Sequence, residues 1–123
     1  MFEPEDSFEV LASSTRTEGE VDVRQVELRV VPEPACVEGH FPGDPVVPAV
    51  SQLLDVVDPQ VRAAWPDLGP LCRVSRVKFL AALRPGDGLT VTLRRPRGTR
   101  TVQVEIRRGE APATRGSFEY GEA

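Results

Sequence analysis

Two segments near the C-terminal end of the chain alternate strictly between apolar and polar residues. The apolar positions are Leu89, Val91 and Leu93 in the first segment, and Val102, Val104 and Ile106 in the second. Such alternation is typical of a strand that has one face in a core and the other in water. The stretch between them, residues 94–100, contains the proline and the glycine of a hairpin connection. The two segments therefore predict a pair of neighbouring antiparallel strands.

Other stretches of the chain also show strand patterns. Val21 and Val23 alternate, and residues 26–30 then alternate in the opposite phase. This change of phase predicts a β-bulge near Arg24 and Gln25. Three further strands are expected over residues 8–13, 71–83 and 114–120.

One stretch of the sequence has helical periodicity. Its apolar stripe at positions i, i+3, i+4 and i+7 consists of Val50, Leu53, Leu54 and Val57. Pro48 precedes the stripe, and Asp58 with Pro59 resembles an N-cap and a first-turn proline. A second short helix is therefore expected through about Trp65. Two strands, an interrupted helix and four strands predict an α+β fold, in which a curved antiparallel sheet wraps around a short central helix.

Length and composition fit one domain over residues 1–123, large enough for a core without disulfides or metals. No apolar run approaches the roughly 18 residues that a membrane span needs. The first ten residues are acidic, unlike a secretory signal, so a cytoplasmic location is expected. Cys36 and Cys72 are too few for a disulfide scaffold, and nothing completes a metal site around Cys36 and His40. We expect no metal, no cofactor, and no nucleic-acid or membrane partner.

The net charge of −4 is unevenly distributed along the chain. Residues 1–61 contain three Arg and thirteen Asp or Glu, whereas residues 62–115 contain twelve Arg or Lys and four acidic residues. The basic half, including Arg94, Arg95, Arg97 and Arg100, could face an acidic carrier protein or the phosphates of coenzyme A. The same arginines could equally be solvated outer positions of strands. Both interpretations remain open at this point.

The loop before the helix contains the only histidine, His40. Pro42, Pro45 and Pro48 are spaced by three residues, which predicts a stiff and extended loop. Such a loop can hold a side chain in fixed geometry beside the free N–H groups of a helix start. A lone histidine is more often structural than catalytic, and this loop context is what makes His40 a catalytic candidate.

Two motifs in the sequence resemble those of a known family. The run GHFPGDPVVPAVSQL, residues 39–53, resembles the signature of the FabA/FabZ-type 3-hydroxyacyl-carrier-protein dehydratases. Its end is most similar to the ApeI-like branch, which serves aryl polyene synthesis, although no role follows for Gln52. Residues 78–89 resemble the Phe-x-x-x-Val-x-Pro-Gly-Asp-x-Leu strand and turn of the same family. The resemblance covers residues 28–93 and implies a hotdog fold.

The resemblance also implies roles for individual residues. In the family, the histidine removes the α-proton of a 3-hydroxyacyl thioester, which would be the role of His40. A backbone N–H at the helix start polarises the thioester carbonyl, and the matching residue here is Ala49, where the family usually has glycine. Gly43 would let the loop turn. We expect Phe41 and Val50, together with Gly43 and Ala49, to contact the substrate.

The catalytic acid of the family stands fourteen residues after the histidine, and this position is Leu54 here. Asp55 follows one residue later, about 100° further around a regular helix. In one interpretation, the acid is lost and Asp55 is a surface residue. In the other, Leu54 is a one-residue insertion, and a π-bulge returns Asp55 to the site. The regular apolar stripe favours the first interpretation, whereas the frequency of π-bulges at functional sites favours the second.

Three functions are compatible with these residues. The chain could be a dehydratase or hydratase of 3-hydroxyacyl thioesters, on acyl carrier protein or coenzyme A, in fatty-acid, polyketide or aryl-polyene-type lipid metabolism. It could instead contribute His40 to a composite site with a partner hotdog chain that supplies the acid. A third possibility is a non-catalytic acyl-thioester binder or a thioesterase. A homodimer or heterodimer is expected, because a curved sheet with one short helix leaves strand edges uncovered.

Overall fold

A computed structural model describes residues 8–31 and 52–122 of the chain. The elements in chain order are β1 (Phe8–Glu18), β2 (Val21–Val30), η3 (Gln52–Val57), α2 (Asp58–Ala64), β3 (Leu68–Phe79), β4 (Gly88–Pro96), β5 (Thr101–Arg108) and β6 (Ala111–Glu122). The strands form one six-stranded sheet in the order β1-β2-β4-β5-β6-β3. All neighbouring strands are antiparallel. The predicted order of two strands, a helix and four strands is therefore confirmed.

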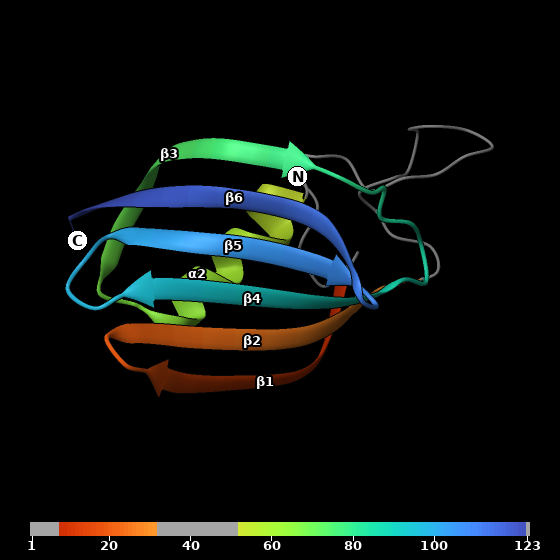
Figure 1. Cartoon of the computed structure of the whole chain (residues 1–123), viewed down its shortest axis with the longest axis horizontal. Coiled ribbons are helices and arrows are strands. Elements are labelled where there is room, and N and C mark those ends of the chain that lie inside the picture. The colour runs from red at the N-terminus through yellow and green to blue at the C-terminus, as the bar shows by residue number, and fades with distance from the viewer. Residues whose placement is uncertain (1–7, 32–51, 123) are drawn as a thin grey trace.

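The helical segment, η3 followed by α2, lies against one face of the curved sheet (Figure 1). We call this the inner face of the sheet and the opposite one the outer face. The core lies between the inner face and the helical segment. The helical segment contributes Val56, Val57 and Val61 to this core. The sheet contributes alternate residues, including Val26, Leu28, Val30, Leu89, Val91, Leu93, Val102, Val104, Ile106 and Phe118. The alternation in the sequence thus predicted the inner face of β4 and β5 correctly.

The predicted bulge near Arg24 and Gln25 in β2 is wrong. β2 pairs with β4 one residue to one residue from Val21 to Arg29, without a shift of register. Val23 is buried, but it is not part of the core cluster that contains Val26. Residues three apart in a regular strand point to opposite faces, so the valines change face while the backbone stays regular. The shift lies instead on β1, between Val10 and Ala12.

The strand predicted over residues 71–83 begins earlier, at Leu68, and ends earlier, at Phe79. Beyond Phe79, the N–H groups of Leu80 and Ala81 both donate to the carbonyl of Ala113. Two donors on one acceptor cannot continue a ladder, so the strand ends there. The following turn is closed by the Asp87 carboxylate, which accepts a hydrogen bond from the Arg84 N–H at 2.8 Å.

The two helices form one uninterrupted segment, in which Val57 has helical backbone angles and α2 follows directly. Pro59 lies in the first turn of α2, as predicted, but Asp58 is not the N-cap. Its carboxylate accepts a hydrogen bond from the Tyr120 hydroxyl at 2.9 Å and pairs with Arg62 at 3.3 Å. A helix entered from another helix has no exposed first turn for Asp58 to cap. No helix within residues 8–31 and 52–122 is long and apolar enough to cross a membrane.

Candidate functional site

The segment that the apolar stripe predicted as a regular helix is a π-helix over Gln52–Val57. A π-helix forms hydrogen bonds between residues i and i+5, so its turn holds one residue more than an α-helical turn. Asp55 lies within this turn, directly after Leu54. Such a turn can absorb a one-residue insertion. It is therefore compatible with the second interpretation, in which Leu54 is the inserted residue.

Asp55 lines a hollow of about 520 Å³ between the helical segment and the first two strands. The walls include Phe8, Val10, Leu28, Val31, Asp55 and Val56. This volume lies within the range of small-molecule sites, which are mostly apolar with a few polar groups. The hollow therefore combines apolar walls with a half-buried carboxylate from the π turn.

The walls of this hollow come from three separate parts of the chain. Phe8 of β1, Leu28 of β2 and Val56 of η3 are each at most 5% exposed. A second carboxylate in the lining, Glu9, forms an exposed ion pair with Arg29 at 2.8 Å. The two acidic residues of the lining thus belong to different elements, Glu9 to β1 of the sheet and Asp55 to η3.

Gln52 begins the π turn and is buried, with 4% of its surface exposed. Its side-chain oxygen accepts a hydrogen bond of 2.6 Å from the Thr114 hydroxyl of β6. A buried polar pair of this kind fixes the position of both side chains, because breaking it leaves an unsatisfied group in the core. The pair anchors the start of the turn that carries Asp55. Sequence reasoning missed it, since Gln52 is separated from Thr114 by 62 positions.

The other predicted site residues, His40, Phe41, Gly43, Ala49 and Val50, lie outside the described residues. Cys36 also lies outside them. Cys72 is an exposed free cysteine. Within residues 8–31 and 52–122, no three His, Cys, Asp or Glu side chains cluster closely enough to hold a metal ion.

A second polar cluster closes the C-terminal end of α2. Arg95 is buried and donates two hydrogen bonds to the Asp67 carboxylate, at 3.0 and 2.9 Å, and one to the Thr99 carbonyl at 2.8 Å. Its guanidinium also lies 5.9 Å from the centre of the Trp65 ring. The hydrogen bonds from Arg95 hold the pKa of Asp67 below its usual value. Each of these groups is satisfied by another, so the cluster is structural.

The four arginines that the sequence offered either as a basic face or as solvated positions differ in their surroundings. Arg95 is buried in the cluster with Asp67 and is not available to an acidic partner. Arg94, Arg97 and Arg100 are exposed, and each pairs with a carboxylate, at 2.9, 3.7 and 3.3 Å respectively. Exposed pairs of this kind contribute little to stability. Arg94 is thus a solvated outer position of β4, and Arg97 and Arg100 lie in the solvated connection between β4 and β5.

Comparison with known families matches the profile described as ApeI dehydratase, of the ApeI-like family, to residues 14–117. The chain belongs to the ApeI-like dehydratase family. The match includes the π turn, Asp55 and all of β2, β3, β4 and β5. No curated protein matches the ApeI-like chain.

Solved structures show that this ApeI-like chain has a hotdog fold. An uncharacterised protein from Erwinia carotovora subsp. atroseptica superimposes with a TM-score of 0.78 and 24% identity, covering 92% of this chain and 94% of the other. The dehydratase heterocomplex ApeI:P from Xenorhabdus doucetiae gives 0.77 and 20%, covering 90% and 95%. The protein yhdA from Lactococcus lactis, which carries the name of a thioesterase, gives 0.63 and 8%, covering 96% and 94%. The predicted fold is confirmed.

Proposed function

We propose that this ApeI-like chain catalyses the reversible removal of water from 3-hydroxyacyl thioesters carried by acyl carrier protein or coenzyme A. His40 removes the proton from the α-carbon, and the Ala49 N–H stabilises the negative charge that develops on the thioester oxygen. Asp55 donates a proton to the 3-hydroxyl group as its C–O bond breaks. A double bond forms between the α- and β-carbons, and water leaves. The products are a 2-enoyl thioester and water, and no cofactor is required.

The observation that carries this proposal is the position of Asp55 in a π turn that lines an apolar hollow. The reaction needs a proton donor at the leaving oxygen, because hydroxide is a poor leaving group. The hollow has apolar walls that suit an acyl chain, with the carboxyl group at its side. Asp55 is the only acidic residue of η3, and the next one, Asp58, is held by Tyr120 and Arg62.

The remaining assignments follow from the motif before the helix. Phe41, Gly43 and Val50 contact the acyl thioester near the base and the Ala49 N–H. A cytoplasmic location is part of this proposal. Pathways that build fatty-acid, polyketide or aryl-polyene chains by repeated two-carbon extension would supply such a 3-hydroxyacyl substrate.

A second candidate function is a composite site that is shared with a partner hotdog chain. The edge strands β1 and β3 carry four half-exposed apolar residues in or directly after them, Val10, Leu11, Phe79 and Leu80. Apolar side chains along open edges favour association with another chain. The structural neighbour from Xenorhabdus doucetiae is itself a heterocomplex. In this case the chain supplies His40, and the partner supplies the acid.

The test measures hydration of a crotonyl thioester and dehydration of a 3-hydroxybutyryl thioester by the purified chain. Asp55→Asn keeps the size of the side chain but removes the transferable proton, so the rate should fall by about 10²–10⁴-fold. His40→Ala should lose activity without unfolding. Asp58→Asn is the matched control, because it removes a carboxylate three residues away that contacts Tyr120 instead of the hollow.

The outcomes separate the two candidates. Loss of activity in Asp55→Asn and His40→Ala, with Asp58→Asn near wild type, supports the dehydratase with its own acid. Activity that appears only when a partner hotdog chain is added, and that tolerates Asp55→Asn, supports the composite site. Release of free thiol from the thioester would show a thioesterase and contradict both.

A further inference from the structure

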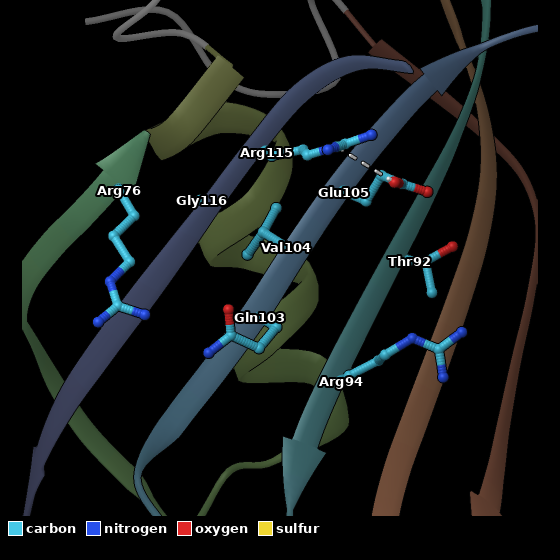
Figure 2. Close-up of a pocket in the computed structure, with 8 residues that line it drawn as sticks. All are labelled: Arg76, Thr92, Arg94, Gln103, Val104, Glu105, Arg115 and Gly116. Atoms are coloured by element: carbon cyan, nitrogen blue, oxygen red, sulfur yellow. Dashed lines mark ion pairs between the residues drawn. The ribbon is translucent and has the colours of Figure 1, made fainter. Parts of the chain in front are cut away.

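The outer face of the sheet carries a second hollow, of about 410 Å³, which the proposed dehydration does not use. Figure 2 views it with the helical segment behind the sheet. Three arginines from three different strands line it, Arg76 of β3, Arg94 of β4 and Arg115 of β6. The lining also contains Thr92, Gln103 and Glu105. We call this the arginine hollow.

Arg76 has an unusual backbone conformation for an arginine in a strand. Its φ of 55° makes it the one non-glycine residue with positive φ within residues 8–31 and 52–122. This left-handed region is unfavourable for residues other than glycine, asparagine and aspartate. A residue kept there against this cost points to a role for its side chain.

A β-bulge produces this conformation. Ser75 pairs with Ser117, and Lys78 pairs with Arg115, so two residues of β3 stand opposite the single residue Gly116. A Cβ atom at Gly116 would lie 3.2 Å from the Val77 side chain, so glycine leaves the room that the bulge needs. Bulges re-aim side chains. Here the Arg76 side chain extends from β3 over β6, at one side of the arginine hollow (Figure 2).

The charges around the arginine hollow leave an excess of positive charge. Arg115 pairs with Glu105 at 3.7 Å, and Arg94 pairs with Glu18 at 2.9 Å. Both are exposed pairs, which contribute little and can be exchanged for a stronger anion. The Arg76 guanidinium makes no ion pair or hydrogen bond with any residue that the structure describes. The lining therefore holds three arginines against one carboxylate, Glu105.

We propose that the arginine hollow binds a small molecule that carries a phosphate monoester or diphosphate group, with Arg76 as its principal contact. The planar guanidinium donates two parallel hydrogen bonds to a phosphate, and this geometry distinguishes phosphate from chloride. Gln103 and Thr92 supply neutral groups for the rest of the molecule, and the volume is within the small-molecule range. The arginine hollow lies on the opposite face of the sheet from Asp55, so this proposal does not depend on the dehydratase.

The test is calorimetric titration of the chain with inorganic phosphate, pyrophosphate and ADP at constant ionic strength. Pyrophosphate and ADP should bind more tightly than phosphate, since they carry more charge. Arg76→Gln should weaken binding by about tenfold or more, equivalent to the loss of one strong contact. Arg73→Gln is the control, because Arg73 is exposed on the same strand but does not line the hollow.

A second variant separates the strain from the binding. Arg76→Gly places glycine at a positive φ, so it should raise the Tm while it abolishes binding. The proposal is overturned if none of the three anions binds at millimolar concentration, or if only an acidic protein binds. Equal weakening by Arg76→Gln and Arg73→Gln would also overturn it, as this would show a diffuse charge effect.

Discussion

The two halves of the helical segment use their polar side chains in different ways. In α2, Asp58 is held between Tyr120 and Arg62, and beyond the end of the helix Asp67 is held by Arg95. In η3, the carboxylate of Asp55 lines the wall of a hollow. Carboxylates at and beyond one end of the segment therefore connect parts of the fold, whereas Asp55 at the other end is among the residues that line the hollow.

The backbone differs in the same way as the side chains. α2 is a regular helix whose Pro59 and Val61 fit its first turn and its buried face. η3 is a π-helix, which is rare and less favourable than an α-helix of the same residues. The irregular backbone coincides with Asp55, the residue that we propose as the catalytic acid. The regular backbone of α2 thus carries structural contacts, whereas the irregular backbone of η3 carries the residue that we propose as the acid.

After Asp55→Asn itself, the largest expected effect is on the stability of the α2 end. Arg95→Met removes three hydrogen bonds and the contact with Trp65, and should lower the free energy of unfolding by about 2–3 kcal/mol. Activity per folded molecule should not change, because the cluster is structural. Urea denaturation and steady-state kinetics measure both quantities. The control is Arg100→Met, at an exposed pair, whose free energy of unfolding should stay within about 0.5 kcal/mol of wild type. A fall of kcat in Arg95→Met would show that the cluster also serves the site.

A smaller loss of stability, with an effect on activity, is expected at the η3 end. Thr114→Val leaves the buried oxygen of Gln52 without its hydrogen bond from Thr114, which should cost about 1–2 kcal/mol. Because Gln52 begins the turn that carries Asp55, kcat should fall while KM stays close to wild type. Thr114→Ser, which keeps the hydroxyl, should recover most of kcat. If kcat is unchanged in Thr114→Val, Gln52 has only a structural role.

The smallest effect expected is a pH dependence at Asp67. The pKa of Asp67 is lowered by the hydrogen bonds from Arg95, so its carboxylate stabilises the fold when charged. The contribution is fully present above the unfolded value of 3.8 and is lost as the pH falls through the lower folded value. The stability difference between wild type and Asp67→Asn should therefore shrink in acid. Since Asp67 is mostly exposed, added salt should also reduce this stability difference. A difference that grows in acid would contradict this assignment.

Much of the fold could be predicted from the sequence, because strand alternation has a simple physical cause. The inner faces of β4 and β5 followed directly from period-two hydrophobicity. The strand order could not be predicted, because the pairing of β2 with β4 and of β3 with β6 joins segments that are distant in sequence. The bulge was predicted wrongly near Arg24, because Val23 is buried on the outer face and the apolar pattern therefore changes phase although the strand pairing is regular.

The candidate site was harder to predict from the sequence than the fold. The spacing from His40 identified Leu54 and Asp55 as the two candidate positions for the catalytic acid. The same residues, however, can form either a π turn or an α-helical turn, and the sequence does not distinguish them. Asp58 was predicted as a helix cap, because its bond to Tyr120 depends on tertiary packing. Arg76 carries no local signal at all, since its bulge is set by Gly116 on another strand.

If the π turn absorbs one extra residue and so brings Asp55 to the acid position, deletion of Leu54 should restore the spacing of the family without loss of the acid. The deletion places the aspartate fourteen residues after His40, as in the family, and allows a regular helix. The measurement is the hydration rate of a crotonyl thioester. We predict a folded variant whose rate stays within about tenfold of wild type, a change in barrier of about 1.4 kcal/mol, and which still loses activity when the aspartate is replaced by asparagine. A folded deletion variant as inactive as Asp55→Asn would contradict the claim.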